Sequence, residues 1–333
     1  MINIIFTIDY EIYGDGSGSV QQHVLAPASR LMDIFLEAGC RMVLFVEAAE
    51  FEAMDKTSAY PEIEEVKRQL RTFHEKGFEI GYHLHPQWFG ATLTDTSWNL
   101  DYKYYNLCLH PKAEIRKLVF RGISYLKEML ADPSFSPISY RAGNWLLQPT
   151  EAMAEVLREA GVLIDSSVFK GGLQRALGLD YRPAVRNGYY WRFHEDVNTP
   201  TTSGILVEIP IYTELVPAWR MIKPKRLKIH KTKKKSNVSK GMTAKARFTR
   251  LMDLLRFRYP LKFDFCRMTL KELTSLVENI IKEDYEDPAT FRPIVAIGHT
   301  KDLSDFGTVE LFLTYLKEKQ ITVSTFKDIL HRL

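Results

Sequence analysis

The chain has 333 residues, of which 45% are hydrophobic and 26% are charged, and these proportions are typical of a globular protein. They exclude a collagen, a coiled coil and a disordered tail protein. The length suits one large α/β barrel or two medium domains. The three cysteines, Cys40, Cys108 and Cys266, show no C-x-x-C spacing, so neither a disulfide framework nor a cysteine zinc site is indicated.

The N-terminal segment reads as a strand, because it lacks the basic region, long apolar region and small-residue cleavage site of a secretory signal. No run of 18 or more apolar residues is present, so we expect no transmembrane helix. With so few cysteines, these features predict a cytoplasmic protein. If it meets a membrane, we expect it to do so as a peripheral protein at the inner face.

The net charge of +4 is unevenly distributed. Residues 220–250 hold thirteen of the 45 Lys and Arg residues and no Asp or Glu, which leaves 32 basic against 41 acidic residues elsewhere. We interpret this segment as a basic insertion. It is either a solvated loop or a contact with an anionic membrane surface or a phosphate-bearing substrate. Nucleic acid is not expected as a partner, since no helix-turn-helix, finger or aromatic platform accompanies the charge.

Short apolar runs alternate with amphipathic stretches along the chain. We predict strands at residues 2–8, 42–46, 78–84, 138–141, 161–164, 205–211 and 293–297. We predict helices at residues 26–38, 61–76, 112–130, 149–160, 270–282 and 309–319. This alternation indicates βαβ units with parallel strands, and about seven such units favour a single barrel domain over residues 1–333. Neither G-x-G-x-x-G after the first strand nor a P-loop occurs, which disfavours nucleotide chemistry.

Polar residues occur where the predicted strands end, the place where a barrel builds its active site. Asp9 and Glu11 end the first strand two residues apart, so strand periodicity directs both to one face. A pair of carboxylates there is costly unless a metal, an Arg or hydrogen bonds compensate. An acidic turn after the strand is an equally open interpretation for this pair alone.

The third strand ends in His83 and His85, again two residues apart, so both imidazoles can converge on one ion. Imidazole and carboxylate are ligands of a catalytic zinc or a similar divalent ion, which takes three protein ligands and leaves one position for water. A single histidine is more often a core or surface residue. Two at this spacing after an apolar strand indicate a metal site.

Three further strands also end in polar residues. Arg141 ends the fourth strand, and its guanidinium can hold a carboxylate by two hydrogen bonds. Asp165 ends the fifth, where a helix N-cap or Asx turn is the alternative. His299 ends the seventh. Each of these residues alone has an ordinary structural explanation, whereas the whole set indicates an active site.

The segments around these residues resemble the five motifs of the polysaccharide deacetylase family, the fourth family of carbohydrate esterases, in order and rough spacing. The resemblance runs from about residue 3 to 325 and is interrupted by the basic segment. It implies a distorted (β/α)7 barrel. The family's usual first motif is Thr-Phe-Asp-Asp, whereas here Tyr10 and Glu11 follow Asp9. Its usual second motif has three residues between the histidines, whereas here one residue separates His83 from His85.

The resemblance implies roles for these residues. Asp9 would be the catalytic base, Arg141 would orient it, His299 would protonate the leaving group, and Asp165 lies in the region of the fourth motif. Glu11, His83 and His85 would hold a divalent ion, with zinc as the first choice. Such an ion lowers the pKa of bound water to about 7 and polarises a carbonyl group. A further expectation is that aromatic side chains contact the sugar ring, about half of them being core residues instead: Tyr10, Tyr82, Trp88, Trp98, Tyr140 and Trp145.

The implied function is removal of an acetyl group from an N- or O-acetylated sugar of a polysaccharide, or of its lipid- or nucleotide-linked precursor, as in surface-polysaccharide or lipopolysaccharide assembly. Two alternatives stay open. One is an amidohydrolase-type metal hydrolase, although that superfamily places H-x-H after its first strand, where this chain has Asp9 and Glu11. The other is a noncatalytic barrel that binds carbohydrate or a membrane surface.

Overall fold

A computed structural model describes residues 1–95, 97–221, 248–249, 252–253 and 256–333. One large sheet organises this part of the chain. Its strands are β1 (Ile2–Tyr10), β2 (Val43–Glu47), β3 (Glu79–Leu84), β6 (Ser139–Ala142), β7 (Ile164–Asp165), β10 (Trp191–Phe193), β11 (Leu206–Glu208), β14 (Arg292–His299) and β15 (Thr322–Val323). They follow the order β10-β11-β7-β6-β3-β2-β1-β14, and β15 also pairs with β1.

All pairings in this sheet are parallel except that of β10 with β11. The sheet is curled: Ile211, just beyond β11 at one side, forms parallel bridges to Phe169 and to Val295 of β14 at the other side. The sequence prediction of an α/β fold with a TIM-like, curved parallel sheet is therefore confirmed. Strand β1 shows why parallel pairing forms, since eight of its nine residues are buried and its sequence is almost continuously apolar.

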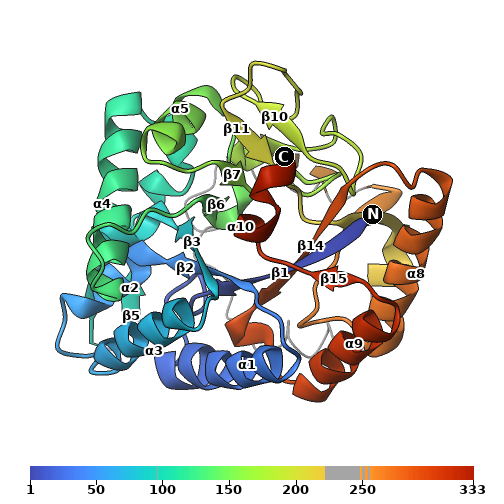
Figure 1. Cartoon of the computed structure of the whole chain (residues 1–333). Coiled ribbons are helices and arrows are strands. Elements are labelled where there is room, and N and C mark those ends of the chain that lie inside the picture. Colours follow the sequence, from blue (N-terminus) through green and yellow to red (C-terminus); the bar gives the residue numbers. More distant parts are fainter. Residues whose placement is uncertain (96, 222–247, 250–251, 254–255) are drawn as a thin grey trace.

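Helices surround the sheet, except that the last helix of the chain lies near the centre of the view, over one end of the strands (Figure 1). They are α1 (Ala26–Glu37), α2 (Ala48–Asp55), α3 (Ile63–Glu75), α4 (Lys112–Leu130), α5 (Glu151–Glu159), α8 (Leu270–Glu286), α9 (Phe306–Glu318) and α10 (Phe326–Ile329). The longer ones bury one face, as an amphipathic sequence requires, and α8 begins with a capping box formed by Thr269 and Glu272. Among the described residues, three small two-stranded antiparallel sheets lie apart from the large one: β4 (Thr92–Thr94) with β5 (Ser97–Asn99), β8 (Leu173–Gln174) with β9 (Leu179–Asp180), and β12 (Thr213–Pro217) with β13 (Arg258–Lys262).

The two ends of the sheet have different surroundings. At the amino ends of the strands, α10 packs against the core: the Phe326 ring lies 6.1 Å from that of Phe45, and Lys327 N donates to Glu79 Oε2 at the start of β3. Figure 1 shows α10 crossing this end near the centre of the molecule. The carboxyl ends of the strands lie on the other side, where the polar residues of the sequence prediction end their strands.

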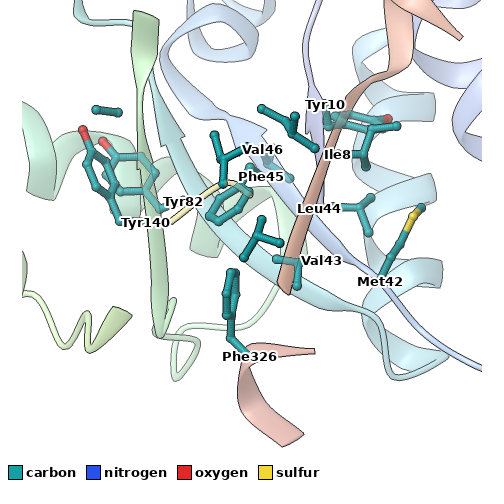
Figure 2. Close-up of a cluster of buried hydrophobic side chains, with 14 of the residues drawn as sticks. Ile8, Tyr10, Met42, Val43, Leu44, Phe45, Val46, Tyr82, Tyr140 and Phe326 are labelled. Carbon is teal, nitrogen blue, oxygen red and sulfur yellow. The ribbon is translucent and has the colours of Figure 1, made fainter. Parts of the chain in front are cut away.

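Aromatic side chains are packed among aliphatic ones in the buried core (Figure 2). The figure shows Tyr10, Tyr82, Tyr140 and Phe45 within one cluster of buried hydrophobic side chains. The Tyr82 and Tyr140 rings lie 5.5 Å apart. The Tyr10 hydroxyl donates to Gln69 Oε1 at 2.7 Å, which satisfies its polar end inside the protein.

Several elements differ from the sequence prediction. Helix α2 follows β2 directly, although its eight residues gave no clear helical period. The fifth predicted strand contracts to Ile164–Asp165, and the sixth to Leu206–Glu208. Residues 222–247 and 250–251, which make up most of the predicted basic insertion, lie outside the described residues. Among the helices that the structure describes, none is both long and apolar enough to cross a bilayer.

Candidate active site

Sheet register brings the predicted polar residues to one level. Asp9 of β1 lies opposite His299 of β14, and His83 of β3 lies opposite Arg141 of β6. Tyr140, the residue before Arg141, lies opposite Asp165 of β7. Because parallel strands end at the same edge of a sheet, residues far apart in the sequence become neighbours there.

A cavity of about 250 Å³ opens at these carboxyl ends. Its wall contains both groups of the sequence prediction, Asp9 with His299, and Glu11 with His83 and His85. The lining residues that the sequence analysis had not selected are Gly14, Ala142, Asn144, Lys262, Asp264, Arg267, Ile297, Lys301 and Asp302, and Trp145 completes the wall. The wall therefore combines acids, imidazoles and amino or guanidinium groups in one small space.

Asp9 is held from two sides. Arg141 Nη1 donates to Asp9 Oδ1 at 2.6 Å, and His299 Nε2 lies 3.3 Å from Asp9 Oδ2. Arg141 is itself fixed, because its Nε and Nη2 donate to Ser166 O and Thr7 Oγ1, each at 2.9 Å. Burial, followed by the charges of Lys301 and Arg267, holds the pKa of His299 well below its usual value. His299 is therefore a neutral imidazole at pH 7 that can exchange a proton with Asp9.

Glu11, His83 and His85 form a second group within the same cavity. Glu11 Oε2 lies 3.1 Å from His85 Nε2 and 3.5 Å from His83 Nε2, and the three ligand atoms lie within 4.8 Å of one another. Ligand atoms of Asp9, Glu11 and His299 also lie within 4.8 Å of one another. Glu11 therefore belongs to two possible groups of metal ligands.

This donor set fits a divalent ion. His83 Nδ1 lies 2.8 Å from Arg141 O, where it donates its proton and leaves the Nε2 lone pair facing Glu11. His83 Nε2 and Glu11 Oε2 are buried, and neither makes a well-formed hydrogen bond within the described part of the chain. Orphaned buried polar atoms are costly. A divalent ion bound by one carboxylate oxygen and two imidazole nitrogens would satisfy them.

Lys301 supplies a cation to the same carboxylate. Its Nζ lies 2.6 Å from Glu11 Oε1 and donates to Ile12 O at 2.8 Å. Burial alone would raise the pKa of Glu11, but Lys301 and the two histidines outweigh it and hold that pKa well below its usual value. Glu11 is therefore ionised, with one oxygen paired to Lys301 and the other facing the imidazoles.

Two fully buried acids behind the cavity position the second group. Glu47 Oε1 accepts from His85 N at 2.7 Å, its Oε2 accepts from Glu50 N, and Glu50 Oε1 accepts from Ile12 N at 2.8 Å. Glu47 and Glu50 thus fix the backbone at His85 and beside Glu11. Burial raises the pKa of each acid, and the neighbouring acids Glu50 and Glu11 add to the effect.

Asp165 lies behind the cavity and does not line it. Its Oδ2 accepts from Ser167 N at 2.9 Å and its Oδ1 from Ser167 Oγ at 2.8 Å. Ser167 Oγ in turn accepts from Ala142 N, the residue after Arg141. Asp165 therefore shapes the turn that surrounds Arg141, and its catalytic role stays a prediction.

Of the residues predicted to contact a sugar, Trp145 lines the cavity, whereas Tyr10, Trp88 and Tyr140 are buried outside its lining. Tyr82 and Trp98 are also outside it.

The turn that carries Trp145 has an unusual backbone conformation. Trp145 and the preceding Asn144 both have a positive φ, 60° and 54° respectively, a conformation that costs about 1–3 kcal/mol per residue. Tyr181 holds this turn, because its hydroxyl donates to Trp145 O at 2.5 Å.

The sequence carried signals for some residues that its analysis missed. Lys301 follows His299 by two residues, the same spacing that selected the other pairs. Gly143 was a second signal, because a glycine stands two residues after Arg141 at the end of a predicted strand. The structure shows why: a Cβ there would lie 2.4 Å from Leu84 O and 2.8 Å from His85 Cγ. Glu47 was a third signal, because it is an acid directly after the apolar strand predicted at residues 42–46. Its contact with His85 N appears only in the structure.

No family model and no curated protein sequence matches the chain. Solved structures show similarity over nearly its whole length. A protein from Mycobacterium smegmatis described as a polysaccharide deacetylase is 15% identical, with a TM-score of 0.54 over 99% of this chain and 89% of that one. A GH57-type branching enzyme from Pyrococcus horikoshii is 10% identical, with a TM-score of 0.59 over 99% and 70%. The 4-alpha-glucanotransferase from Thermococcus litoralis is 14% identical, with a TM-score of 0.54 over 100% of this chain and 40% of that one. At these identities the similarity shows a shared fold.

Proposed function

We propose that the protein is a metal-dependent hydrolase that removes an acetyl group from an acetylated sugar of a polysaccharide or of its lipid- or nucleotide-linked precursor. The observation that carries this proposal is the meeting of two groups in one cavity, Asp9 with Arg141 and His299, and Glu11 with His83 and His85. The first group can move protons, and the second can hold a divalent ion, with zinc as our first choice. The fold shared with a protein described as a polysaccharide deacetylase is consistent with it.

Within this proposal, the residues of the chain have separate tasks. A divalent ion at Glu11, His83 and His85 would lower the pKa of water and polarise the acetyl carbonyl group. Asp9, held in position by Arg141, would take a proton from the attacking water molecule. Because His299 Nε2 lies 3.3 Å from Asp9 Oδ2, the proton can pass to His299 and from there to the departing amine of the sugar. A neutral resting His299 suits this relay.

The proposal includes the finer fold prediction. The seven parallel strands β1, β2, β3, β6, β7, β11 and β14 would form a distorted (β/α)7 barrel within one domain. The bridges of Ile211 to Phe169 and Val295 support this closure. In a barrel of this type the reactive residues lie at the carboxyl ends of the strands, where the cavity opens.

Acetate release tests this function. Wild-type protein loaded with zinc should release acetate from acetylated amino sugars, and Asp9→Asn, which keeps the size of the side chain, should lower kcat by about 100-fold or more, since it removes a general base. Lys117→Met, at an exposed lysine of α4, is the matched control and should retain full activity. Equal rates for wild type and Asp9→Asn would reject the proposed base.

One observation favours a noncatalytic carbohydrate-binding protein as the second candidate. Lys301 already compensates the charge of Glu11 without any metal. Metal analysis of protein purified without chelator separates the two candidates. About one zinc per chain, lost in Glu11→Gln, supports the hydrolase, whereas a site that stays empty after zinc addition supports the binding protein.

A further inference from the structure

The wall of the cavity beside Trp145 presents a cation where the sequence predicted an apolar surface. Lys262 Nζ lies 3.1 Å from the centroid of the Trp145 ring and 4.3 Å from that of Phe169. The ammonium group therefore covers one face of Trp145, and that face cannot stack against a sugar ring. A molecule that enters this part of the cavity meets the head group of Lys262.

Lys262 differs from the other cations around the cavity because it has no ion-pair partner among the described residues. Arg141 pairs with Asp9, Lys301 pairs with Glu11, and Arg267 pairs with Asp302. The charged groups that act most strongly on Lys262 are Arg267, Asp264, Asp9 and Arg141, and both acids are engaged elsewhere.

Asp264 shows this engagement in detail. Its Oδ1 accepts from Cys266 N and from Arg267 N, each at 3.1 Å, and its Oδ2 lies 3.6 Å from Arg267 Nε. Asp264 is thus turned toward the backbone and guanidinium of the following turn. Asp9 is occupied by Arg141 and His299. No acid of the described wall is therefore available to Lys262.

The arrangement is electrically unfavourable for Lys262 as it stands. Burial, followed by the charge of Arg267, holds the pKa of Lys262 well below its usual value. A charged amine in such a place needs a partner. A divalent ion at Glu11, His83 and His85 would make the cavity more positive and increase that need. An anionic group of a bound molecule is the partner that the wall lacks.

We infer that Lys262 forms an anion subsite, so that the acetylated sugar carries a carboxylate or phosphate substituent that pairs with its ammonium group beside Trp145. This inference rests on the proposed function, because it specifies the substrate of the same cavity. The aromatic rings of Trp145 and Phe169 hold the ammonium from the opposite side by cation–π contact. They fix the position of the amine, and a bound anion beside it would favour its charged form.

The test compares neutral and anionic sugars. The zinc-loaded full chain is assayed for acetate release from N-acetylglucosamine, its 1-phosphate and 6-phosphate, and N-acetylmuramic acid. Wild type should favour at least one anionic sugar over N-acetylglucosamine. A phosphate ester as the favoured sugar would identify phosphate as the group, and N-acetylmuramic acid would identify carboxylate.

In Lys262→Met the ratio of kcat/KM between the favoured anionic sugar and N-acetylglucosamine should fall by about 10-fold or more, through KM, since a hydrogen bond to a charged group is lost. Lys262→Arg should retain most of the ratio, and Lys117→Met should retain all of it. An unchanged ratio in Lys262→Met, or a wild type that favours the neutral sugar, would overturn the subsite.

Titration calorimetry with the same sugars keeps this result separate from catalysis. If no sugar is deacetylated, the proposed function fails, yet tighter binding of an anionic sugar to wild type than to Lys262→Met would still support the subsite. Equal binding of every sugar to both proteins would refute it. A thermal melt of each variant shows whether it is folded.

Discussion

Two of the pairs of buried carboxylates in the described structure have opposite surroundings. Around the cavity, Asp9 and Glu11 each contact a cation, Arg141 and Lys301, at 2.6 Å. Behind it, the described structure gives Asp165 and Glu208 no cation in contact, and they lie opposite each other on β7 and β11. The first pair is held by cations and faces a space that a reactant can enter, whereas the second supports turns of the backbone. Burial of an acid alone therefore does not mark an active site.

The second pair is understood as two acids that share one proton. Burial, followed by the charge of Asp165, raises the pKa of Glu208 well above its usual value. Glu208 Oε1 accepts from Val168 N at 3.1 Å, and its buried Oε2 accepts from no described donor. A protonated Oε2 that donates to Asp165 satisfies both side chains, since Asp165 accepts from Ser167 with its two oxygens.

The largest expected effect on stability comes from removing the cation of the first pair. Arg141→Met leaves Asp9 buried with no guanidinium, so the free energy of unfolding should fall by about 3–5 kcal/mol, as measured by urea denaturation. Combining it with Asp9→Asn should restore part of the loss, because the unpaired charge is then gone. A loss below about 1 kcal/mol in the single variant would show that Asp9 has another stabilising partner.

A second change distinguishes an acid that serves the proposed metal site from one that does not. Glu47→Gln replaces one of the two oxygens that accept from His85 N and Glu50 N, so zinc affinity should fall by about 10-fold, the scale of a supporting contact around a metal ligand. Competition with a chelating dye measures it. Glu208→Gln is the matched control and should leave zinc affinity unchanged. An equal loss of zinc affinity in both variants would contradict the role of Glu47 in positioning His85.

The smallest effect concerns pH. Because the pKa of Glu208 is raised in the folded protein, its stabilising contribution is complete below the unfolded value of about 4.3 and is lost as the pH rises through the folded value. Glu208→Gln mimics the protonated acid and cannot ionise. It should match wild type near pH 4 and exceed it by about 1 kcal/mol at higher pH. Parallel stability curves from pH 4 to 9 would contradict a shared proton.

Much of the site was predictable from spacing. Asp9 with Glu11, and His83 with His85, follow the period of two of a strand, and each pair ends an apolar run. Arg141 and His299 were selected singly, because each ends a predicted strand. The fold class followed from the alternation of strands and helices. Glu47 and Lys262 were not selected, and the covering of Trp145 by Lys262 was not predicted, because these features depend on contacts between segments far apart in the chain.

The sequence by itself determined which strands are buried and which residues end them, because apolar patterning and side-chain alternation are local properties. The tertiary structure alone decided which charges neutralise one another. Lys301 pairs with Glu11, which lies 290 positions away in the sequence. Glu47 accepts a hydrogen bond from the backbone of His85. Lys262 lies over the ring of Trp145 and does not pair with an acid. Electrostatic energy depends on distance in space, and only the register and curvature of the sheet set those distances.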